Sequence, residues 1–253
     1  MLNPAWVEAT ADEFWRAAGG APPPPRDPAP AILYATPLAV VSLPRLRPAA
    51  VDGWLRRHGV APLLGAADGR LHACLVVAAG SGVIFLEGGD PPDQRRFSLA
   101  HEVAHFLLDY LHPRERALQA LGPDIVPVLD GRRAPTLDER VQAVLADAPL
   151  GVYRQLFAYD DPAVARQEGA ADRLAVELLA PAALAVPLAR VATGASWAAR
   201  HATLAAALAG AFGLPAAVAA GYATRLLRHV GAGPSFAEWL GLSNSGESSG
   251  KDR

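Results

Sequence analysis

The feature that most constrains the fold is the motif His101-Glu102-x-x-His105, inside an apolar, helix-compatible stretch at residues 97–111. On an α-helix, positions i and i+4 lie on one face about one turn apart, so both imidazoles can reach a single ion. Glu102 lies about 100° around the helix from His101, near a water bound to that ion. This spacing favours a zinc site with a general base, while a chance match or a structural histidine pair is the alternative.

A third ligand would distinguish these readings, and Glu168 is the candidate. It precedes a run with apolar residues at helical spacing that Pro181 ends, namely positions 171, 174, 175, 178 and 179. Glu168 and Asp172 are then i and i+4, so Glu168 can complete the ligand set while Asp172 accepts the free N–H of a ligand histidine. A solvated helix face is the alternative for this pair. Glu177 is a rival ligand, but it has no acidic partner at i+4.

The segment around the histidine motif and the segment that begins at Glu168 resemble two sequence blocks of the ImmA/IrrE family of zinc metallopeptidases. The first block reads R-F-S-L-A-H-E-V-A-H-F-L-L over residues 96–108, and the second reads E-x-x-A-D-x-L-A-x-x-L-L-x-P over residues 168–181. The resemblance implies Zn²⁺ on His101, His105 and Glu168, with Glu102 as the catalytic base. Asp172 falls on the family's Asn/Asp position, and its role in orienting a histidine is inferred from spacing.

The chain departs from the family pattern at two packing positions and in one spacing. Leu174 stands where the family commonly has Phe, and Ala180 where it commonly has Met. Residues 106–167 separate the histidine motif from Glu168 by more than a compact member needs. We interpret residues of about 112–162 as an insertion with helices at 137–145 and 152–158, which would act as a lid or shape the substrate site.

Composition is that of an ordinary globular protein. The 253 residues are 51% hydrophobic and 19% charged, with a net charge of −2, which gives no global signature of nucleic-acid or membrane-surface binding. No apolar run is long enough to span a bilayer, and the N-terminus does not read as a signal peptide. Cys74 is the only cysteine, so no intrachain disulfide can form and we expect a cytoplasmic protein with Cys74 buried as a small apolar residue.

The fold class predicted is α+β, with a small, mostly antiparallel sheet packed on helices and a helical C-terminal portion. Strands are expected at 70–78 and 82–87, and we expect the 82–87 strand or its hairpin partner to be a sheet edge that accepts a substrate strand. The alternative is an ordinary paired strand. The predicted division has four parts: an N-terminal helix and proline-rich linker at 1–31, a zincin-like domain at 32–190, a helical region at 191–242, and a disordered tail at 243–253.

Aromatic residues mark the N-terminal helix, where Trp6, Phe14 and Trp15 are expected to anchor packing. Near the other end, two helices around residues 213–215 resemble a helix-turn-helix. The second of them is rich in alanine, with Arg225 and Arg228 only near its C-terminal end, whereas recognition helices usually contact bases near their N-terminal end. We therefore expect these helices to pack and do not expect direct nucleic-acid binding.

Two functions from different classes follow. The first is a zinc metalloendopeptidase whose substrate, as the resemblance implies, is a regulatory protein such as a helix-turn-helix repressor cleaved in response to stress. The second is a non-catalytic regulator on a zincin scaffold that binds a partner protein or DNA through its C-terminal helices. Glu102 favours the first, since a retired enzyme has no need of a general base. Metal storage or sensing fits a single site poorly.

Overall fold

The computed structural model describes residues 2–62, 64, 69–146, 148, 150 and 162–234. The chain forms two compact units, of which the larger is Asn3–Pro181 and the smaller begins at Ala182. The larger unit thus includes the N-terminal helix and the proline-rich segment. Its helices surround one small sheet, so the predicted α+β class is confirmed.

The sheet has three strands in the order β1-β3-β2: β1 (Leu38–Leu43), β2 (Ala73–Ala78) and β3 (Ser81–Glu87). β2 and β3 form an antiparallel hairpin, whereas β1 joins β3 in parallel, so the sheet is mixed and not mostly antiparallel. The hairpin turn consists of Ala79 and Gly80, both with positive φ, as a tight two-residue turn requires. β3 is the central strand, so of the two strands named as candidates for an edge it is the hairpin partner β2 that lies there, while β1 forms the opposite edge.

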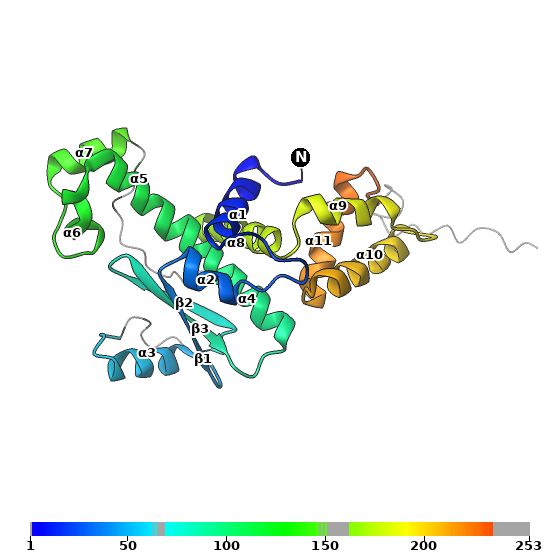
Figure 1. Cartoon of the computed structure of the whole chain (residues 1–253), viewed down its shortest axis with the longest axis horizontal. Coiled ribbons are helices and arrows are strands. Elements are labelled where there is room, and N and C mark those ends of the chain that lie inside the picture. Colours follow the sequence, from blue (N-terminus) through cyan, green and yellow to red (C-terminus); the bar gives the residue numbers. More distant parts are fainter. Residues whose placement is uncertain are drawn as a thin grey trace, which may run out of the picture. The chain divides into compact units, whose positions relative to one another are not determined.

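One face of the sheet packs on α3 (Pro48–Arg57), and α4 (Pro92–His105) packs on the β2–β3 hairpin from the other (Figure 1). The α3 face is a buried cluster that includes Val51, Cys74 and Phe85. Cys74 is fully buried, as predicted, and burial raises the pKa of its thiol, so the thiol stays protonated and inert at neutral pH.

The helix that carries the histidine motif continues well beyond it. α4 passes directly into a π-helical segment, η1 (Phe106–Leu111), and then into α5 (His112–Leu121). The predicted helix at 97–111 is therefore present, but its second part has wider turns. α8 (Pro162–Leu179) packs against α4 and supplies Leu174, Leu178 and Leu179 to the core.

The N-terminal helix α1 (Ala5–Ala17) also packs on α8. Phe14 and Trp15 are buried, as predicted, whereas Trp6 is 39% exposed. Next in the chain is a proline-rich stretch that ends in the short helix α2 (Ala29–Ala35).

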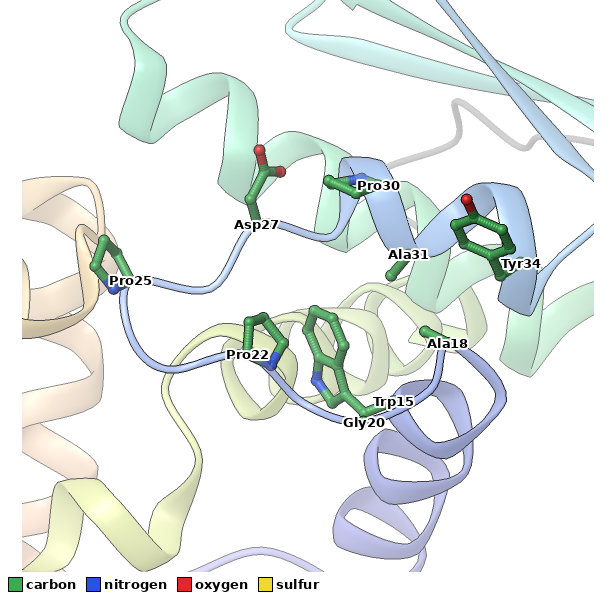
Figure 2. A pocket seen from close by; sticks show the side chains of 9 residues that line it. All are labelled: Trp15, Ala18, Gly20, Pro22, Pro25, Asp27, Pro30, Ala31 and Tyr34. Carbon is green, nitrogen blue, oxygen red and sulfur yellow. The ribbon is translucent and has the colours of Figure 1, made fainter.

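A cavity of about 330 Å³ lies between α1, the proline-rich stretch and α2. Figure 2 shows Trp15 and Pro22 beside each other at this cavity, with Tyr34 of α2 at its far end. Arg26 stacks over the Trp15 ring at 5.7 Å from its centre. The proline-rich stretch is therefore folded back onto the core of the larger unit.

The described residues between 112 and 150 form a helical segment with a small core of its own, built around Ala117, Ile125 and Val128. The predicted helix at 137–145 is present as α7 (Leu137–Leu145), and a Thr136–Glu139 capping box starts it. The other elements here are η2 (Pro123–Ile125) and α6 (Val126–Leu129). The helix expected at 152–158 lies outside the described residues.

The smaller unit is helical, with α9 (Ala182–Val191), α10 (Trp197–Phe212) and α11 (Ala216–His229). Gly213 takes the left-handed conformation that ends α10, and α10 and α11 pack against each other. The tail expected at 243–253 lies outside the described residues. In the part of the chain that is described, no single helix has the length and hydropathy to cross a membrane, although the successive helices α8 and α9 together meet that test by length and composition alone.

Candidate metal centre

Three predicted site residues meet where α4 packs against α8. The Nε2 atoms of His101 and His105 lie 3.0 Å apart, and the Glu168 carboxylate reaches both, with its oxygens 3.2 Å from His101 Nε2 and 3.5 Å from His105 Nε2. The motif supplies two donors one turn apart on α4, and α8 supplies the third from 63 positions beyond His105 (168 − 105). The structure thus brings together the three residues that the sequence suggested as ligands.

The spacing of these donors fits a tetrahedral ion. Ligand atoms at about 2.0–2.1 Å from a tetrahedral zinc ion lie about 3.3 Å from one another. The distances of 3.0 to 3.5 Å, which join the two Nε2 atoms to each other and each of them to one Glu168 oxygen, bracket that value, and one donor atom from each residue would leave a fourth position for water. Two imidazoles and a carboxylate are also a donor set that zinc accepts in catalytic sites.

A carboxylate lies against the other nitrogen of each imidazole. His101 Nδ1 is 3.0 Å from Asp172 Oδ1, as the spacing of α8 predicted, and His105 Nδ1 is 2.7 Å from Asp109 Oδ2. Asp109 was missed in the sequence, although its place four residues after His105 was the available signal. With their Nδ1 atoms facing acids, both rings present Nε2 to the shared centre.

The acids around the histidines dominate the electrostatics of the centre. Burial lowers the pKa of His101, but Asp172 and Glu168 raise it more, and burial of His105 is likewise outweighed by Asp109 and Glu168. The hydrogen bonds from His101 and His105 hold the pKa of Glu168 well below its usual range. Such a negative pocket favours positive charge between the rings, whether protons or a divalent cation.

Glu102 lies beside this centre in a buried position. Its side chain is only 6% exposed, and the backbone N–H of Leu75 in the edge strand β2 donates to its carboxylate. Within the described residues, its Oε2 atom has no hydrogen-bond partner. Burial raises the pKa of Glu102, which brings it closer to that of an effective proton acceptor at neutral pH. A buried oxygen without a protein partner fits a group that waits for a water molecule.

Glu177, the rival third ligand, has a different place. It is buried further along α8, where its Oε2 accepts a hydrogen bond of 2.9 Å from Asn3 Nδ2. It is not part of the group of donors around His101. Glu177 therefore joins the N-terminus of the larger unit to α8, and Glu168 remains the candidate ligand.

A comparison with known protein families found a match that includes the histidine motif. Residues 61–123 match a peptidase family model described as the IrrE N-terminal-like domain. The match includes the edge strand β2, the histidine motif and Asp109, whereas Glu168 and Asp172 lie beyond it. No curated protein and no solved structure matches the chain. The match supports the resemblance to the ImmA/IrrE family, because residues 61–123 are similar to its IrrE N-terminal-like domain.

Proposed function

We propose that the protein is a zinc-dependent endopeptidase that hydrolyses peptide bonds of a protein substrate. The family match points to a metallopeptidase-type function. The observation that carries the finer proposal is the buried, unpartnered Oε2 of Glu102 beside the converged His101, His105 and Glu168, within the described residues. A purely structural cluster gains nothing from burying such an oxygen, which costs about 1–3 kcal/mol.

His101, His105 and Glu168 would hold the ion, and their summed charge of −1 would leave it with a net charge of about +1. Bound there, zinc would polarise a substrate carbonyl and would lower the pKa of a water molecule from about 15.7 towards about 7. Glu102 takes a proton from the attacking water on Oε2 and then delivers it to the leaving amine nitrogen. The Leu75 N–H holds the Glu102 carboxylate on the side of the edge strand.

For the substrate we propose a regulatory protein of the repressor type. The resemblance to the ImmA/IrrE family supports this choice, and repressors of the helix-turn-helix kind encoded near the gene are the first to test. We also propose that the reaction takes place in the cytoplasm, because the single Cys74 leaves no intrachain disulfide to form.

The test compares the wild-type protein with the Glu102→Gln variant, each loaded with zinc. Both are incubated with a purified candidate repressor and, separately, with labelled casein, and the products are identified by mass spectrometry. The variant keeps the shape of the side chain and all three ligands, so we expect it to bind zinc but to cleave about 10²–10⁴-fold more slowly. Equal cleavage by the two proteins contradicts the mechanism. Binding of the repressor without cleavage by either protein supports the non-catalytic regulator instead.

A further inference from the structure

His105 is the last residue of α4, directly before η1. Its Nδ1 atom lies against the carboxylate of Asp109, an acid that is not part of the histidine motif. Asp109 Oδ2 lies 2.7 Å from His105 Nδ1, which is the shortest of the contacts among the histidines and acids of the centre. The side chains are 9% and 15% exposed, for His105 and Asp109 respectively. The contact is therefore shielded from water, where a charged hydrogen bond is stronger than at the surface.

We infer that Asp109 is a positioning residue, which fixes the ring orientation and tautomer of His105 so that Nε2 is presented to the metal. A neutral imidazole carries its proton on one nitrogen only. A carboxylate against Nδ1 holds that proton there, which leaves the lone pair of Nε2 facing His101 and Glu168. This inference rests on the proposed zinc site and adds a determinant of its affinity.

Asp109 lies in the π-helical segment η1, four residues after His105. In a regular α-helix, four residues turn through about 400°, so residue i+4 lies past residue i by about 40°. The wider turns of η1, whose hydrogen bonds join residues i and i+5, rotate less per residue and so carry residue 109 less far around the axis. Such segments are frequent at functional sites.

Neighbouring contacts hold η1 in place, so Asp109 cannot easily swing away. Phe106 and Leu107 are buried in the core, and the hydroxyl of Tyr110 accepts a 2.6 Å hydrogen bond from the N–H of Gly80 in the hairpin turn. The turn between β2 and β3 therefore anchors the segment that carries Asp109. Preorganisation of this kind is what a metal ligand needs from its support.

Asp172 offers an internal comparison, because it occupies the same position against His101. Its contact is longer, at 3.0 Å, and its side chain is 53% exposed. Water competes for an exposed carboxylate, which weakens its hold on the ring. The structure therefore ranks Asp109 above Asp172 in its effect on the metal.

The experiment measures zinc affinity by competition with a chromophoric chelator for the wild-type chain, Asp109→Asn, Asp172→Asn and the control Glu115→Gln. The control removes an acid from an exposed position on α5, the next helix after η1, and that acid is not part of the donor group. We expect affinity to fall about 10–100-fold in Asp109→Asn, less in Asp172→Asn, and not in Glu115→Gln. Unfolding of the metal-free proteins in urea should show Asp109→Asn to be folded.

An affinity of Asp109→Asn within twofold of the wild-type value overturns the inference, as does a loss of affinity matched by Glu115→Gln. If Asp109→Asn does not fold, nitrogen NMR of the zinc-loaded wild-type chain decides: a proton on Nδ1 of His105 supports the inference, and a proton on Nε2 overturns it.

A wild-type chain that binds no zinc overturns both this inference and the proposed function. A chain that binds zinc with an Asp109 effect, while Glu102→Gln cleaves normally, contradicts the proposed catalytic step alone.

Discussion

At the scale of single residues, the candidate metal centre combines two histidines with acidic side chains that can balance a positive charge on them. His101 and His105 face each other through their Nε2 atoms, which is unfavourable for two protonated rings unless acids surround them. Glu168, Asp172 and Asp109 supply those acids. The same acids that stabilise protonated imidazoles in the metal-free chain would stabilise a divalent cation in their place.

Zinc binding should therefore compete with protons. Contacts with the acids outweigh burial and raise the pKa of His101 to about 9 and that of His105 to about 10, so protons compete with a metal for these rings at neutral pH. A ligand must be neutral to bind, so binding should release protons at pH 7, and the apparent affinity should rise with pH. Chelator competition over a pH series, with calorimetry in buffers of different ionisation enthalpy, measures both effects. An affinity that does not change with pH would contradict this account.

At the scale of elements, α8 carries Glu168 and Asp172 and depends on the N-terminal part of the unit for its position. Trp15 Nε1 donates to the carbonyl of Leu178 at 3.2 Å, and an Arg26 guanidinium nitrogen lies 3.5 Å from the same oxygen. The carbonyls of a helix's last turn have no partner within the helix, so these donors satisfy a group that would otherwise be left open. Together with the Asn3–Glu177 hydrogen bond, they fasten α8 through its C-terminal end.

Asn3→Ala should destabilise the larger unit without touching the metal centre. The substitution removes the amide donor to the buried Glu177 carboxylate, and removing one partner of a buried hydrogen bond costs about 1–3 kcal/mol. Urea unfolding of the metal-free protein measures the change, and Glu8→Gln on the exposed side of α1 serves as the control. A stability equal to that of the control would show that this contact contributes nothing.

The elements also show how far sequence reasoning reaches. Local periodicity predicts the helix around His101 and the helix from Glu168, because each pattern repeats within a few turns. The parallel pairing of β1 with β3 has no such local signal, since it joins strands with a helix and another strand between them. The exposure of Trp6 and the π-helical turns before His112 likewise depend on what the rest of the chain packs there. Asp109 stands four residues after His105 in the sequence, but no local pattern indicates that its carboxylate faces the imidazole of a ligand.

At the scale of the whole molecule, a bound ion would link α4 to a helix that begins more than fifty residues later. A ligand that binds only the folded state stabilises it by RT ln(1 + [L]/Kd), which is about 4 kcal/mol at a thousandfold excess over Kd. Zinc should therefore raise the unfolding midpoint of the wild-type chain, and a chelator should reverse the rise. The His101→Ala variant should show no zinc-dependent change, and a midpoint that rises equally in this variant would place the zinc elsewhere.

The central claim is that His101, His105 and Glu168 together hold one divalent cation. Its most direct test is the zinc content per chain, measured by elemental analysis of purified wild-type protein, Glu168→Ala and the neighbouring control Gln167→Ala. Gln167 is exposed on the same turn of α8 and is not part of the group of donors. The account predicts one zinc ion per chain in the wild-type and control proteins and a loss of zinc in Glu168→Ala. Full zinc content in Glu168→Ala, or none in the wild-type protein reconstituted with zinc, would contradict it.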